Sequence, residues 1–136
     1  MKLELRKFNP ATIPNDSIIC ILGKRGVGKS VLLKDILSYQ RDIPVGVVIS
    51  PTETANAYFE SFVPRMLCYE SASEDVLQTF LKRQIAISTE RKKELKKFGN
   101  SQTDARAFLI LDDCLYDKKW VNSESIRSIF MNGRHY

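Results

Sequence analysis

Residues 23–30 of the chain, GKRGVGKS, have the types and spacing of a loop that binds a phosphate group. The pattern G-x-x-x-x-G-K-[ST] has four fixed positions, filled here by Gly23, Gly28, Lys29 and Ser30. Glycines allow backbone dihedrals at which successive N–H groups point toward one anion. Lys29 supplies a positive charge for the β and γ phosphates, and the Ser30 hydroxyl can bind magnesium. The loop predicts a nucleotide-binding site, for ATP or GTP with Mg²⁺; the alternative is a glycine-rich turn without a ligand.

The segments on either side of this loop must hold it in place. An apolar run over Ser17–Leu22 predicts a strand before it. Apolar residues at helical spacing up to Tyr39 predict a helix after it, with the positive end of its dipole at the anion. We expect the whole loop to contact the nucleotide. The predicted nucleotide-binding residues are Gly23, Lys24, Arg25, Gly26, Val27, Gly28, Lys29, Ser30 and Val31.

Two adjacent acids, Asp112 and Asp113, follow the apolar run Ala107–Leu111. Downstream of a phosphate loop, the first acid is expected to bind magnesium directly or through water. The second is expected to orient or activate the attacking water, so the pair favours hydrolysis over transfer to a substrate hydroxyl. The alternative for Asp113 is a helix-capping or loop acid.

Further apolar patterns place these motifs in an α/β domain with a parallel sheet. Residues 45–50 and 63–69 predict strands, with Pro64 keeping the second near an edge or a start. Residues 74–97 predict a helix, and Asn122 or Ser123 can cap a second helix that runs through Met131. The long helix ends in a basic run that could meet a nucleic-acid backbone; the alternative is a solvated helix end.

Composition narrows the class of protein. The chain has 136 residues, the size of one domain spanning 1–136, and its 43% hydrophobic and 27% charged content is ordinary for a soluble protein. The formal net charge of +5 permits a nucleic-acid partner without demonstrating one. The N-terminus has no apolar run of signal-peptide length, and no apolar run is long enough to span a membrane. Cys20 and Cys68 lie in apolar runs and are expected in the core, which predicts a reducing, intracellular compartment.

With these motifs in view, the chain resembles the genome-packaging ATPases of large nucleocytoplasmic DNA viruses and their virophage and polinton relatives. These belong to the FtsK–HerA group of P-loop ATPases. The matching stretches are ILGKRGVGKS at 21–30, VVISPTE at 47–53, FLILDDC at 108–114 and IFMNGRHY at 129–136. They are spread along nearly the whole chain, and the double-Asp strand followed by N-G-R-H is the specific part.

The resemblance implies a RecA-like (ASCE) parallel sheet with helices on both faces and ATP hydrolysis with Mg²⁺. It implies a homo-oligomeric ring that threads double-stranded DNA, capsid or portal-vertex partners, and a location in the host cytoplasm at the viral assembly site or in the virion. Lys29 would belong to the Walker A motif, and Asp112 of Walker B would be the magnesium acid. Asp113 would stand in the place of the catalytic glutamate, one methylene shorter.

The C-terminus departs from the family. Family members continue past this point into a strand with a polar sensor residue, which the RecA-like order inserts beside the acid strand. We therefore expect the chain to be the N-terminal part, or a split or truncated gene product, of a longer ATPase. Arg134 is the candidate for the arginine that reaches a neighbouring subunit's γ-phosphate, Arg127 is a second candidate, and His135 is expected to be structural.

Two other functions remain open from the sequence. A nucleoside or small-molecule kinase also uses a phosphate loop, although no arginine-rich lid segment is present. A nucleotide-binding fragment without turnover is the third possibility. DNA-stimulated phosphate release, phosphoryl transfer to a nucleoside, or binding without hydrolysis would distinguish the three.

Overall fold

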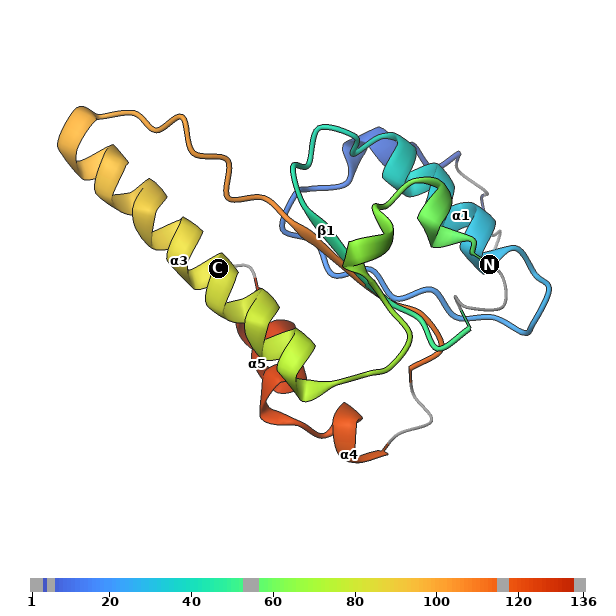
Figure 1. Cartoon of the computed structure of the whole chain (residues 1–136). Coiled ribbons are helices and arrows are strands. Elements are labelled where there is room, and N and C mark those ends of the chain that lie inside the picture. Colours follow the sequence, from blue (N-terminus) through green and yellow to red (C-terminus); the bar gives the residue numbers. More distant parts are fainter. Residues whose placement is uncertain (1–3, 5–6, 53–56, 115–117, 134–136) are drawn as a thin grey trace. The chain divides into compact units, whose positions relative to one another are not determined.

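The computed structural model describes residues 4, 7–52, 57–114 and 118–133, which form helices and a small parallel sheet (Figure 1). Contacts divide the chain into two compact units, Met1–Asp42 and Ile43–Tyr136. The mixed α/β class predicted from the sequence is confirmed by the three-stranded parallel sheet.

The first unit contains the 3-10 helix η1 (Pro10–Thr12) and the α-helix α1 (Lys29–Ser38), which contact each other. Asn9 caps η1, since its Oδ1 accepts a hydrogen bond from the Ala11 N–H at 3.1 Å. The helix predicted to reach Tyr39 is confirmed, because Tyr39 is the C-cap of α1. Of the described residues in this unit, only Ile36 is buried.

The strand predicted over Ser17–Leu22 is wrong. These residues have no regular secondary structure, and Ile18, Ile19 and Leu22 are exposed. A strand is stabilised by hydrogen bonds to a neighbouring strand, and no described residue pairs with this run. The prediction that Cys20 belongs to the core is wrong for the same reason, since its side chain is exposed.

The second unit is built on a parallel sheet with the strand order β2-β1-β3. The central strand β1 (Gly46–Ile49) is buried along its whole length, as expected of a strand covered on both faces. It pairs with β3 (Phe108–Leu111) in the register Gly46–Phe108 to Ile49–Leu111. A Cβ atom at Gly46 would lie 1.9 Å from the Phe108 ring, so the ring occupies the space above this glycine.

The strand predicted over residues 63–69 is mostly wrong. Only Cys68–Tyr69 forms β2, and Arg65–Leu67 forms the 3-10 helix η3. Pro64 is the N-cap of η3, with φ near −54°, and its carbonyl accepts the Leu67 N–H at 2.8 Å. The proline therefore begins a turn here, ahead of the short 3-10 helix. Another 3-10 helix, η2 (Phe59–Ser61), precedes it.

The two long predicted helices are confirmed to within one residue at their described ends. Helix α3 spans Glu74–Phe98 and ends on Gly99, whose φ of 75° is left-handed. Helix α5 spans Glu124–Asn132 and is capped by Ser123, whose hydroxyl accepts the Ile126 N–H at 3.3 Å. A short helix, α4 (Lys118–Val121), lies before it.

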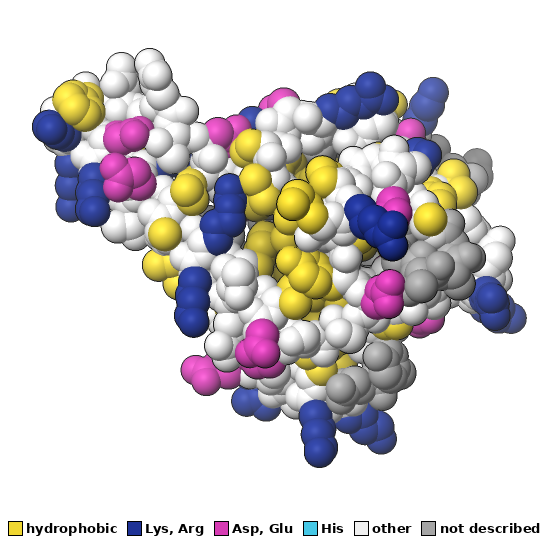
Figure 2. Space-filling model, in the orientation of Figure 1, with side chains coloured by type: hydrophobic (Ala, Val, Ile, Leu, Met, Phe, Trp, Pro, Cys, Tyr) yellow, Lys and Arg dark blue, Asp and Glu magenta, His cyan; other side chains and the backbone are white. Residues whose placement is uncertain are grey.

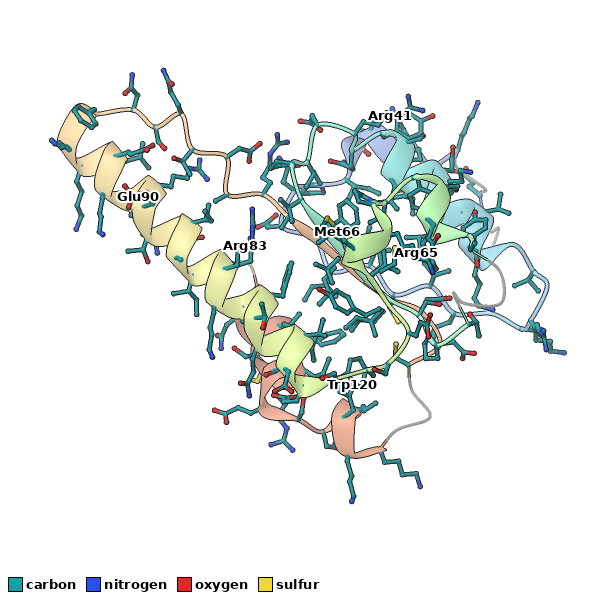
Figure 3. All side chains as sticks on the ribbon, in the orientation of Figure 1. Arg41, Arg65, Met66, Arg83, Glu90 and Trp120 are labelled. Carbon is teal, nitrogen blue, oxygen red and sulfur yellow. The ribbon has the colours of Figure 1, made fainter. Side chains whose placement is uncertain are left out.

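The main core lies between the sheet and these helices. The buried residues of this cluster come from β1, α3 and the C-terminal part of the unit: Val47, Ile49, Leu77, Cys114, Trp120 and Ile126. Figure 3 shows Trp120 among the side chains at the base of α3. Alternation along β1 points Val48 to the opposite face, where it is also fully buried.

The second half of α3 extends past α5 and is held by the segment that returns to β3 (Figure 1). The Glu94 carboxylate accepts hydrogen bonds from the Ser101 hydroxyl and, at 2.9 Å, from the Thr103 hydroxyl. Gln84 donates to the Ala105 carbonyl at 2.9 Å. Lys and Arg side chains lie along one edge of the far end of the helix (Figure 2), and the basic residues Arg91, Lys92, Lys93, Lys96 and Lys97 are exposed.

No helix in the described part of the chain is both long and apolar enough to cross a membrane.

Candidate functional site

The predicted phosphate loop turns sharply before α1 because two of its glycines are left-handed. Gly26 has φ of 80° and Gly28 has φ of 89°, a region that side chains disfavour. Gly28 is the N-cap of α1, and its carbonyl accepts the Leu32 N–H at 2.9 Å. The loop and the helix are therefore joined without a capping side chain over the helix N-terminus.

The Lys29 side chain folds back into the curve of the loop. Its Nζ atom donates to the Gly23 carbonyl at 3.0 Å and to the Lys24 carbonyl at 2.9 Å. A Cβ at Gly23 would lie 2.8 Å from Val27 Cγ2, so a side chain there would require the exposed Val27 side chain to move. The loop backbone therefore holds the Lys29 ammonium group, which the sequence pattern predicts to bind the β and γ phosphates of a nucleotide.

The charges near this loop suit an anion. The first turn of α1 contains no acidic residue, and the side chains of Lys24 and Arg25 are exposed. The N-terminus of a helix carries a partial positive charge and N–H groups that have no partner within the helix. The predicted phosphate loop therefore has two left-handed glycines, Gly26 and Gly28, directly before Lys29 and the start of α1.

The acids lie at the carboxyl end of the sheet in the second unit. Ile49 and Leu111 are the last paired residues of β1 and β3, and the Asp112 N–H donates to the Ile49 carbonyl at 3.0 Å. Asp112 therefore emerges beside Ser50, and the Ser50 hydroxyl donates to Asp112 Oδ2 at 3.0 Å. Asp112 is half-buried, whereas Ser50 is fully buried.

Asp113 is exposed and has a φ of 53°, which is left-handed and uncommon outside glycine. This conformation ends the strand and turns the chain away from β3. Cys114 follows it and is buried, with its thiol 3.3 Å from the Ile49 carbonyl. Burial, followed by the charges of Asp112 and Asp113, raises the pKa of the Cys114 thiol to about 12. The thiol is therefore protonated at neutral pH and is not a nucleophile.

Oxygen ligands fit the magnesium ion that the motifs imply. The predicted ligands are the Ser30 hydroxyl and the Asp112 carboxylate, and Mg²⁺ in nucleotide sites is usually held by one or two such groups with phosphates and waters. Within residues 4, 7–52, 57–114 and 118–133, no three His, Cys, Asp or Glu side chains gather into a metal cluster.

The other predicted site residues are placed as follows. Lys24, Arg25, Val27 and Val31 are exposed, and Ser30 is half-buried. Arg127 lies exposed on α5. Arg134 and His135 lie outside the described residues.

Sequence reasoning did not assign a site role to Ser50 or Thr52. Their hydroxyl oxygens are 3.2 Å apart, and Ser50 joins them to Asp112. Both follow β1 in the stretch SPT, where a serine after an apolar run carries no motif of its own. Only the pairing of β1 with β3 shows that this serine lies beside the acid.

Several proteins with similar sequences come from viruses. An uncharacterized protein of Acanthamoeba polyphaga mimivirus is 38% identical over 136 residues, which is 99% of this chain and 47% of the relative. An uncharacterized protein of Invertebrate iridescent virus 6 is 34% identical over 134 residues, which is 96% of this chain and 47% of the relative. The chain spans about half the length of these relatives.

A bacterial protein also matches part of the chain. The ATP-binding protein Uup of Buchnera aphidicola is 34% identical over 65 residues, covering 48% of this chain and 11% of that protein. No family model and no solved structure matches the chain.

Proposed function

We propose that the protein binds ATP with Mg²⁺ and hydrolyses it. The observation that carries the proposal is the geometry of the predicted loop, in which Gly26 and Gly28 are left-handed and the Lys29 ammonium group donates to the Gly23 and Lys24 carbonyls. A phosphate placed at this loop meets a full charge on Lys29 and the helix N-terminus together. The match to a protein named as ATP-binding supports the choice of an adenine nucleotide.

In the proposed reaction, the loop binds the phosphates, and the acid edge, which consists of Asp112 and Asp113, acts on the metal and on water. Magnesium, when bound, neutralises phosphate charge and positions the phosphate oxygens. In this proposal Ser30 and Asp112 would hold the metal, and Asp113 would accept a proton from the water that attacks the γ phosphorus. The bond between the γ phosphorus and its bridging oxygen breaks, and ADP leaves. Two acids at the end of one strand suit water as the nucleophile.

The motor function belongs to the same proposal. We infer that hydrolysis moves double-stranded DNA into a viral capsid, with copies of the protein arranged in a RecA-like ring at the assembly site. The viral origin of the relatives supports this setting, and the formal net charge of +5 favours an acidic polymer as partner. Capsid or portal-vertex proteins are the expected further partners, and Arg134 the candidate residue acting on a neighbouring subunit's nucleotide.

The first test compares ATP binding and phosphate release in the wild type and in Lys29→Ala. The variant should bind ATP between about tenfold and a hundredfold more weakly, because it loses charge-assisted hydrogen bonds to phosphate, and should not turn ATP over. The matched control is Lys34→Ala, an exposed lysine on the same helix, which should behave as wild type. Phosphate release by Lys29→Ala at the wild-type rate would refute the nucleotide site.

The second test separates the two acids. Asp113→Asn should bind ATP normally and release no phosphate, because the amide cannot accept the proton of water. Asp112→Asn should require more magnesium for the same binding. Equal and mild effects of both substitutions would show that the acid edge takes no part. Stimulation of phosphate release by double-stranded DNA supports a motor, whereas phosphoryl transfer to a nucleoside would replace it with a kinase.

A further inference from the structure

The hydroxyl groups beside Asp112 form an ordered chain. Ser50 Oγ lies 3.0 Å from Asp112 Oδ2 and 3.2 Å from Thr52 Oγ1. A serine hydroxyl has one proton, and a carboxylate can only accept hydrogen bonds. The Ser50 proton is therefore directed to Asp112, and the Thr52 hydroxyl donates to Ser50 Oγ. A donor that itself accepts a hydrogen bond is polarised and donates more strongly.

The backbone holds Ser50 in this position from both sides. Its N–H donates to the Tyr69 carbonyl at 2.9 Å, which continues the pairing of β1 with β2. The Asp112 N–H donates to the Ile49 carbonyl on the other side of β1. Ser50 is fully buried, so its hydroxyl has few alternative partners. The Ser50 hydroxyl, at the end of the central strand β1, is therefore held in place as a hydrogen-bond donor to Asp112, which follows β3.

The two carboxylate oxygens of Asp112 have different surroundings. Oδ2 accepts the Ser50 hydroxyl, while Oδ1 accepts no hydrogen bond from any described residue. A hydrogen bond to one oxygen limits rotation of the carboxylate and orients the other. We propose that Ser50, supported by Thr52, is a positioning residue that fixes Oδ2 and presents Oδ1 to the nucleotide-bound divalent cation. The inference rests on the proposed function, in which Asp112 binds the magnesium of MgATP.

The test measures metal affinity, with Mn²⁺ in place of Mg²⁺ and a non-hydrolysable ATP analogue, by the electron paramagnetic resonance signal of free Mn²⁺. Ser50→Ala should weaken Mn²⁺ binding about tenfold, the effect of one hydrogen bond to a charged group. Thr52→Ala, at an exposed position, should weaken it about threefold, because only the polarisation of Ser50 is lost. Metal-free binding of the analogue should be unchanged in both variants.

Matched controls separate positioning from general structure. Ser61→Ala, an exposed serine whose hydroxyl donates to the Tyr58 carbonyl, should leave Mn²⁺ affinity unchanged. In the Asp112→Asn background, Ser50→Ala should add no further loss, because the oxygen that it positions no longer carries the charge. Thr52→Ala keeps the test decisive if Ser50→Ala does not fold.

Two results would overturn the inference. One is a Mn²⁺ affinity equal to that of the wild type in both Ser50→Ala and Thr52→Ala. The other is that Ser50→Ala lowers Mn²⁺ affinity by the same factor in the wild type and in the Asp112→Asn background. In each case the unmodified chain still binds the analogue through Lys29, so the proposed function stands. If the unmodified chain binds no metal–nucleotide complex, the proposed function fails, and this inference falls with it.

Discussion

The cysteine side chains show how strongly position in the fold controls the chemistry of one residue type. Cys20 is exposed, beside a loop with free access to water. Cys114 is buried under the sheet edge, where burial and the neighbouring charges of Asp112 and Asp113 raise the pKa of its thiol to about 12. Because the thiolate is the reactive form, the two residues should differ in reactivity by far more than exposure alone would give.

Alkylation with iodoacetamide at about pH 8 tests this difference, since an ordinary thiol has a pKa of about 8.5. Cys20 should be modified first, and Cys114 should remain unmodified until the protein unfolds. Peptide mass spectrometry over time gives the two rates, and the denatured protein is the control in which both should react alike. Modification of Cys114 as fast as Cys20 in the folded protein would contradict the burial of Cys114.

The local structure of the candidate site was predictable from the sequence for the residues that belong to a motif. Lys29 and its glycines follow a spacing that the backbone geometry explains, and Asp112 follows an apolar strand. Ser50 was not predictable in this way, because its role depends on the register that places it beside Asp112. A residue whose partner lies 62 positions away leaves no local pattern in the sequence.

At the scale of elements, the contact between Gly46 and Phe108 fixes the start of the β1–β3 pair. Gly46→Ala should lower the free energy of unfolding by about 1–3 kcal/mol, because the new methyl group forces the Phe108 ring out of its position. Chemical denaturation measures the change. Gly133→Ala is the control, since Gly133 has a helical φ of −53° and open space around its Cβ direction. Equal stability of the two variants would show that the ring does not lie over Gly46.

The stability of the C-terminal end of α3 and of the segment that follows it should decrease in acid. Hydrogen bonds from Ser101 and Thr103 lower the pKa of Glu94, and the Arg106 side chain lowers the pKa of Asp104 to about 2. A carboxyl group whose pKa is lower in the folded than in the unfolded protein stabilises the folded state at pH values above the unfolded pKa. This contribution to the free energy of unfolding is lost as the pH falls through the folded pKa. Stability should therefore decrease from about pH 5 toward pH 2. Glu94→Gln should show a shallower decrease in urea denaturation; a decrease as steep as wild type would contradict the role of Glu94.

Elements with strong local signals were predictable. The apolar spacing of α3, the acids in its first turn and Gly99 at its end locate both boundaries. The runs at 17–22 and 63–69 have the apolar character of strands but did not become full strands. In the second run, Pro64 begins a turn; in the first, no described strand pairs with it. Strand formation depends on a partner elsewhere in the chain, which composition cannot supply.

At the scale of the whole molecule, burial is concentrated in one of the two units. Nearly all buried side chains in the described residues belong to Ile43–Tyr136, and the first unit contributes Ile36. Since burial of apolar surface is the main stabilising term in folding, the second unit should be independently stable. A fragment of residues 43–136 should show helical circular dichroism and one cooperative thermal transition. A fragment of residues 1–42 should show neither. A non-cooperative transition in the larger fragment would contradict the division.

The exposed run Ser17–Leu22 has a consequence for the protein in concentrated solution. Six consecutive residues without charge or proline, four of them Ile or Leu, form the type of segment that stacks into intermolecular β-structure. Asp16 on one side and Lys24 with Arg25 on the other act as gatekeepers, because their charges repel a second copy in register. Their repulsion weakens as salt is added, so aggregation of this protein should be governed by six residues beside the phosphate loop and by the ionic strength around them.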